Sequence, residues 1–85
     1  MFRWELEDRA EQDLASLPPR VRQALTEFLE ALVLVDPMEY QRYPGEPYTS
    51  MRSLSFGPQD DGLVWFLVYP PGDLVLVVRI QWLGE

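Results

Sequence analysis

Two arginines in predicted strands are the residues best suited to chemistry in this sequence. Arg52 lies in the extended stretch 51–56, and Arg79 lies in the last apolar run, two residues before Gln81. A guanidinium stabilises negative charge, but it stays protonated and is a poor proton shuttle. For each arginine we weigh an anion or partner contact against a structural role. Arg79 would then pair with a carboxylate on a neighbouring strand, and Arg52 would be paired or snorkel at a strand edge.

The residue types that the chain lacks exclude several kinds of site. The sequence has no cysteine, no histidine and no lysine, so that all seven basic residues are arginine. Disulfides, thiolate metal sites, Schiff-base chemistry and imidazole acid–base catalysis are therefore excluded. We expect neither a metal nor a cofactor. Acidic residues near the N-terminus match no known cation-binding loop, and we interpret them as a solvated surface: Glu5, Glu7, Asp8, Glu11 and Asp13.

Length and charge narrow the class of protein. The 85 residues predict a single domain over 1–85, and 47% hydrophobic content is typical of a globular chain. The net charge of −7 argues against direct nucleic-acid binding and favours a basic or apolar partner. We find no apolar signal core at the N-terminus and no run long enough to span a bilayer, so we expect a cytoplasmic protein without membrane contact.

The first half of the chain predicts a strand and two helices. Residues 2–6 alternate apolar and polar side chains, which indicates a half-buried strand. A short helix follows, with Asp8 and Glu11 resembling a capping box, and it ends before Pro18. A second helix begins at Pro19 and ends near Asp36. Its apolar stripe has helical spacing: Val21, Leu25, Phe28, Leu32 and Val35.

The second half predicts an antiparallel hairpin. Two apolar runs, 62–69 and 74–83, flank a Pro-Pro-Gly-Asp turn, and the stretch 51–56 is a further strand. Residues 37–50 form an irregular connection with three prolines. The order strand, helix, helix, strand, strand, strand predicts a two-layer α+β domain. Both helices then pack on one face of a mainly antiparallel sheet.

The other face of this sheet is the candidate contact surface. On the last strand, alternation places Arg79 and Gln81 on that open face together with Val75, Val77 and Leu83. The helix-facing set would then be Leu74, Leu76, Val78, Ile80 and Trp82. In the run 62–69 both alternating sets are apolar, so the sequence does not decide which set faces the helices and which is exposed. Such an apolar face indicates a contact surface, unless residues 37–50 or the C-terminus cover it. Our candidate partner contacts are Trp65, Leu67, Val77, Leu83, Tyr43 and Tyr48.

The helical region resembles a known family. The segment 14–22 reads LASLPPRVR, and the following helix closes with Asp36-Pro37. This pattern is similar to the paired-helix signature of the RelE/ParE toxin superfamily. The stretch 51–54 resembles that family's next strand, and 75–80 resembles its last long strand. The resemblance covers nearly the whole chain and implies a small toxin of a type II toxin–antitoxin module, associated in the family with plasmid stabilisation.

The resemblance implies three alternatives for function. The first is a toxin-like protein that acts mainly through protein contacts, with a cognate antitoxin and a target of the gyrase or ribosome type. The second is a ribosome-dependent mRNA endonuclease with a reduced catalytic set: Arg52, Arg79, Gln81 and Tyr69. The third is a non-toxic interaction protein that forms a homodimer. We favour the first, since the family's further basic and proton-transferring residues are replaced here by residues such as Leu63, Val64 and Trp82.

Overall fold

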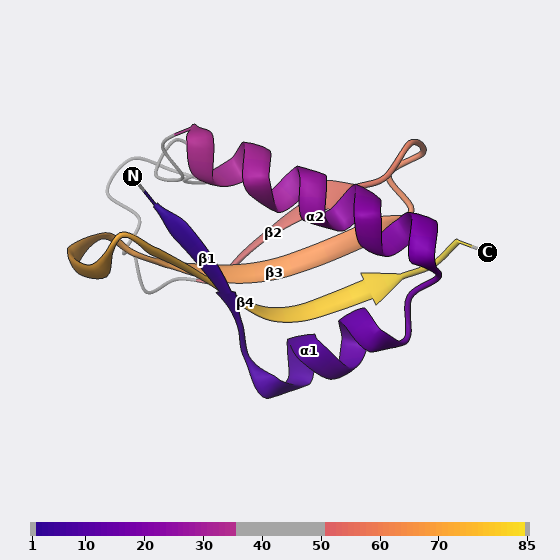
Figure 1. The fold of residues 1–85 in the computed structure, drawn as a ribbon, viewed down its shortest axis with the longest axis horizontal. Helices are drawn as coiled ribbons and strands as arrows, with labels where there is room; N and C mark the ends of the chain where they lie inside the picture. Colours follow the sequence, from indigo (N-terminus) through magenta and orange to yellow (C-terminus); the bar gives the residue numbers. More distant parts are fainter. Residues whose placement is uncertain (1, 36–50, 85) are drawn as a thin grey trace.

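The computed structural model describes residues 2–35 and 51–84, and these form a two-layer α+β domain (Figure 1). The elements follow in the predicted order. They are β1 (Arg3–Leu6), α1 (Asp8–Ala15), α2 (Pro19–Leu34), β2 (Arg52–Phe56), β3 (Gly62–Tyr69), the short 3₁₀ turn η2 (Pro70–Gly72) and β4 (Leu74–Trp82). The predicted fold class is confirmed.

The four strands form one mixed sheet in the order β1-β4-β3-β2. β4 pairs antiparallel with β3, β3 pairs antiparallel with β2, and β1 lies parallel to β4. The β3–β4 hairpin turns through η2 and through Asp73, whose φ of 48° lies in the left-handed region that Asp tolerates. The hairpin therefore forms the centre of the sheet, with β1 and β2 at its edges.

The helix boundaries follow from proline and charge. Pro19 occupies the first turn of α2, where its missing N–H is not needed. The predicted capping box at the start of α1 is wrong. The N-cap is Glu7, without a side-chain hydrogen bond, and Asp8 is already helical. Asp8 and Glu11 lie in the first turn instead, where negative charge interacts favourably with the helix dipole.

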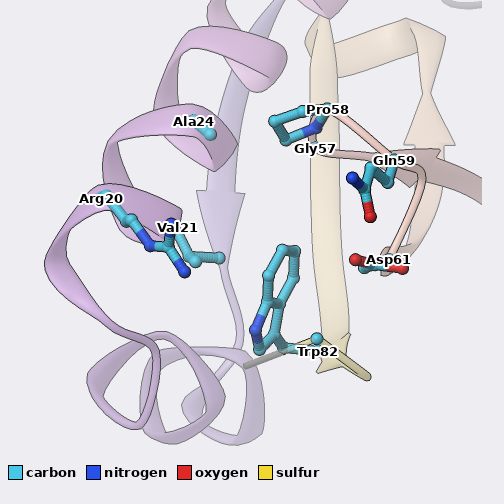
Figure 2. Close-up of a pocket in the computed structure, with 9 residues that line it drawn as sticks. Arg20, Val21, Ala24, Gly57, Pro58, Gln59, Asp61 and Trp82 are labelled. Atoms are coloured by element: carbon cyan, nitrogen blue, oxygen red, sulfur yellow. The ribbon is translucent and has the colours of Figure 1, made fainter.

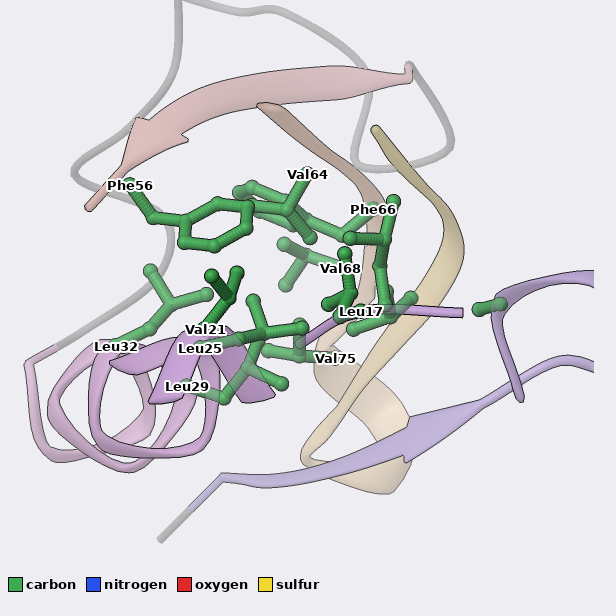
Figure 3. Close-up of a cluster of buried hydrophobic side chains, with 13 residues drawn as sticks. Leu17, Val21, Leu25, Leu29, Leu32, Phe56, Val64, Phe66, Val68 and Val75 are labelled. Carbon is green, nitrogen blue, oxygen red and sulfur yellow. The ribbon is translucent and has the colours of Figure 1, made fainter. Parts of the chain in front are cut away.

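The core lies between the helices and one face of the sheet (Figure 3). In α2 the buried stripe is Val21, Leu25, Leu29 and Leu32. The stripe predicted from the sequence extended too far, since Val35 is 43% exposed. From the sheet, the buried apolar side chains are Phe56, Val64, Phe66, Val68, Val75, Val77 and Ile80. This set settles the open question for β3, because Val64, Phe66 and Val68 face the helices.

A β-bulge in β4 overturns the predicted faces of that strand. Trp65 pairs with Arg79, but the next residue of β3, Phe66, pairs with Val77, so that Val78 is one extra residue. Val75 and Val77 therefore face the helices before the bulge, and Ile80 does so after it. Simple alternation cannot place these residues on one face, since an inserted residue reverses the order of faces beyond it.

Candidate functional site

The sheet face opposite the helices has an apolar centre and polar edges. We call it the open face. Its members are set by the strand register: Arg3 and Glu5 of β1, Leu74, Leu76, Arg79 and Gln81 of β4, Leu63, Trp65, Leu67 and Tyr69 of β3, and Ser53 and Ser55 of β2. The apolar side chains at its centre are only partly buried. Neither α1 nor α2 covers this face, because both pack in the core on the other side.

Arg79 is the cation at the centre of the open face. It is exposed and lies directly across from Trp65, while Gln81 lies across from Leu63. Arg79 forms no ion pair with a described residue, so the structural alternative of a carboxylate partner on a neighbouring strand finds no support there. The pairing places the positive charge of Arg79 beside the indole of Trp65 and the amide of Gln81, on an otherwise apolar part of the sheet.

The four candidate catalytic residues are not brought together. Arg52 pairs with Phe66 on β3, faces the helices and is only 2% exposed, so it lies on the opposite side of the sheet from Arg79. Tyr69 lies on the open face, four residues along β3 from Trp65. At a rise of about 3.3 Å per residue, that separation is about 13 Å. Only Arg79 and Gln81 are neighbours.

The predicted partner contacts divide into four groups. Trp65 and Leu67 lie on the open face. Leu83 follows the end of β4 and is 76% exposed. Val77 is fully buried against the helices, so its predicted placement on the contact surface is wrong, for the reason of the bulge. Tyr43 and Tyr48 lie outside the described residues.

Beside the bulge, a side chain of α1 completes the hydrogen bonding of β4. The parallel ladder ends where Glu7 N–H donates to the carbonyl of Val77 (2.9 Å). Beyond that point Ile80 N–H donates to Asp13 Oδ2 (3.0 Å), and Asp13 Oδ1 accepts from Arg9 Nε (3.2 Å). Sequence reasoning missed this contact, since Asp13 was interpreted only as part of an acidic surface.

A cleft of about 500 Å³ (Figure 2) lies at the other end of the molecule from η2 (Figure 1). It is lined by the first turns of α2, the β2–β3 loop and the end of β4, with the Trp82 ring at its base. Trp82 packs on Phe56 with 5.9 Å between the ring centroids. The polar side chains that line the cleft are the guanidinium of Arg20, the amide of Gln59 and the carboxylate of Asp61. The cleft is distinct from the open face.

Other kinds of site find no support in the described part of the chain. Among residues 2–35 and 51–84, no three acidic side chains converge as a metal site would require. Neither of the two helices described is long and apolar enough to cross a membrane. The candidate site is the open face, because its apolar centre is covered by neither helix.

Comparison with solved structures decides the fold. The isolated RelE toxin of E. coli superposes with a TM-score of 0.77 and 15% identity, over 100% of this chain and 87% of that one. The chain has the RelE fold. A chain of the intact E. coli RelBE toxin–antitoxin complex gives a TM-score of 0.76 at 15% identity, over 100% of both chains. A chain of the RelBE2 toxin–antitoxin complex from Mycobacterium tuberculosis gives a TM-score of 0.75 at 18% identity, over 95% of this chain and 96% of that one.

The RelE fold agrees with the resemblance found in the helical motifs. At 15–18% identity the likeness is one of backbone arrangement, since most side chains differ. No protein-family model matches the chain, and no curated protein sequence matches it. The side chains of the open face therefore have to carry any argument about function.

Two members of the open face were assigned to the wrong side in the sequence. Leu74 and Leu76 were placed against the helices, but the register puts them beside Tyr69 and Leu67. The signal that would have corrected this is chemical. Arg79 and Gln81 are polar and favour the solvent-facing side. Val75 and Val77 are as apolar as Leu74 and Leu76, so either pair could face the helices if the alternation changed before Arg79.

Proposed function

We propose that this chain is the toxin-like component of a toxin–antitoxin module and acts through protein contacts made by its open face. The observation that carries the proposal is the apolar centre of that face, uncovered by either helix, on a chain with the RelE fold. Contiguous apolar surface of this kind is typical of interaction sites. RelE toxins have been crystallised with RelB antitoxins from E. coli and from Pyrococcus horikoshii, which supports a cognate antitoxin as the first partner.

The distribution of charge favours a particular kind of partner. The whole chain carries −7, which predicts basic or apolar contact residues. The open face itself is nearly balanced, with Arg79 at its centre and Arg3 and Glu5 at one edge. A partner with an apolar stripe for Trp65 and the leucines, and one carboxylate for Arg79, fits this pattern best. An amphipathic segment of an antitoxin has these properties.

The same geometry disfavours the endonuclease that the family resemblance implies. RNA cleavage requires groups that activate the 2′-hydroxyl, stabilise the phosphorane and protonate the leaving oxygen. Arg79 would stabilise charge, but Arg52 lies on the opposite face of the sheet. Tyr69 lies about 13 Å along β3 from Trp65, the residue opposite Arg79. Neither histidine nor lysine occurs in the sequence to replace them.

Co-expression with the neighbouring small reading frame tests the proposal. A tagged chain should co-purify with the product of that frame, and expression without it should slow growth. Co-purification should be lost when Trp65 is replaced by Ala and retained when the exposed Leu34 of α2 is replaced by Ala. A chain that neither slows growth nor binds that product, and that forms a homodimer by light scattering, would instead support the stand-alone interaction protein.

A further inference from the structure

The position of Arg79 depends on one extra residue in β4. Before the bulge, Val75 and Val77 face the helices, and uninterrupted alternation would bring Arg79 and Gln81 to that same side. The insertion of Val78 reverses the phase, so that Ile80 is buried and Arg79 is exposed. The bulge therefore creates the charged part of the open face.

A bulge interrupts a ladder and leaves backbone groups to be satisfied by other means. Here the neighbouring strand β1 has already ended, because Leu6 is its last residue paired with β4. α1 runs on beside β4, and the Asp13 carboxylate accepts the Ile80 N–H from that side at 3.0 Å. The Asp13 side chain is 16% exposed, and Arg9 holds its other oxygen at 3.2 Å. The carboxylate thus occupies the place of a missing strand.

We propose that Asp13 is a positioning residue for the open face: it holds the β4 bulge and thereby keeps Arg79 and Gln81 on the partner-binding side. Its functional consequence rests on the function proposed above, whereas its structural consequence does not. Asp13 lies on α1, at the edge of β4 beyond the end of β1, and is not a member of the open face. Its removal should loosen β4 from Val78 to Trp82 and leave the earlier part of the strand unchanged.

Four variants separate the parts of this contact. Asp13→Ala removes the acceptor, whereas Asp13→Asn keeps an oxygen at the same position. Arg9→Ala removes only the ion pair, and Glu11→Ala removes an exposed acid from the same helix as a charge control. If Asp13→Ala does not fold, Asp13→Glu replaces that variant in every comparison, because it displaces the carboxylate by one methylene.

The first measurement is amide hydrogen exchange by NMR on the free protein. An N–H that loses its only acceptor in a partly buried site becomes easier to open, so exchange at Ile80 should rise on the order of tenfold in Asp13→Ala. It should stay near the wild-type rate in Asp13→Asn and Glu11→Ala. Unchanged exchange at Ile80 in Asp13→Ala, or an equal rise at all amides of β3 and β4, would overturn the proposal.

The second measurement uses thiol labelling, since the natural chain has no cysteine. Gln81→Cys reports on the strand after the bulge and Leu76→Cys on the strand before it. Adding Asp13→Ala should change the labelling rate of Cys at 81 and leave that of Cys at 76 as it was. Equal changes at both positions would contradict a local role.

A third measurement links Asp13 to partner binding, with the product of the neighbouring frame as the probe. Asp13→Ala should weaken this binding and Asp13→Asn should restore it. Binding by Asp13→Ala equal to wild type would overturn the positioning role. If the wild-type chain does not bind this probe, the proposed function fails, and the exchange and labelling results still decide whether Asp13 holds the bulge.

Discussion

Trp65 lies directly opposite Arg79 across β3 and β4, and the bulge at Val78 immediately precedes Arg79 in β4. This pair combines the largest apolar side chain of the open face with its central cation. Trp and Arg are the residue types most enriched among binding hot spots, where an indole supplies contact area and a guanidinium supplies directed hydrogen bonds. The pair is therefore the place where partner binding should be most sensitive to substitution.

Trp65→Ala should lower the affinity for the partner by about 2 kcal/mol or more, because the indole is the central apolar contact. Isothermal titration calorimetry with the product of the neighbouring frame measures the change. Leu34→Ala is the matched control, since Leu34 is 72% exposed at the end of α2, on the other side of the sheet. An equal loss of affinity in both variants would show that the open face is not the contact surface.

The two strand arginines should respond in opposite ways. Arg52→Ala removes a side chain that is 2% exposed in the core and should lower the free energy of unfolding by about 1–3 kcal/mol. Arg79→Ala, at an exposed position, should change that free energy by less than about 0.5 kcal/mol and should weaken partner binding. Urea denaturation measures the free energy of unfolding of both variants and distinguishes these two effects. An Arg52→Ala protein that is as stable as wild type but has lost toxicity would instead favour a catalytic Arg52.

Leu25→Ala should lower the free energy of unfolding by about 2–5 kcal/mol, a large share of the stability of a domain this small. Leu25 is 1% exposed at the centre of the α2 stripe, so its loss leaves a cavity among packed neighbours. Leu34→Ala on the same helix should have little effect. Equal midpoints for the two variants in urea would contradict the assignment of the buried stripe.

Gly62→Ala should destabilise the β2–β3 connection, because a Cβ there would overlap the ring of Phe56. Overpacking of this kind lowers stability by about 1–3 kcal/mol. Gly72→Ala provides the control, since a Cβ at Gly72 would meet no atom within 4 Å. Thermal unfolding of the two variants tests the packing of Phe56 against β3, and a melting temperature for Gly62→Ala as high as that for Gly72→Ala would show that the ring lies elsewhere.

The sequence predicted the elements well because each has a local cause. Proline at 18 and 19 separates the helices, and the Pro-Pro-Gly-Asp turn separates β3 from β4. The faces of β4 could not be derived in the same way. All five residues from Leu74 to Val78 are Leu or Val, and such a run has no polar residue that shows which of its side chains face solvent. The Asp13 carboxylate, which accepts the Ile80 N–H just beyond the bulge, lies 67 positions from Ile80 in the chain.

The candidate site was predicted only in part for the same reason. Trp65 and Leu67 were expected as partner contacts, and the register places both on the open face. Arg52 was grouped with Arg79 from a family motif, but a motif on one strand does not determine which side of the sheet a residue faces. Only the pairing of Arg52 with Phe66 shows that it belongs to the core.

Methyl NMR of the complex tests the central claim most directly. Leucine methyls at 63, 67, 74 and 76 report on the open face, whereas valine methyls at 64, 68, 75 and 77 report on the helix-facing side of the same two strands. Adding the product of the neighbouring frame to a leucine- and valine-labelled chain should shift the leucine signals and leave these four valine signals nearly unchanged. Shifts confined to the valines, or to the leucines of α2, would contradict binding through the open face.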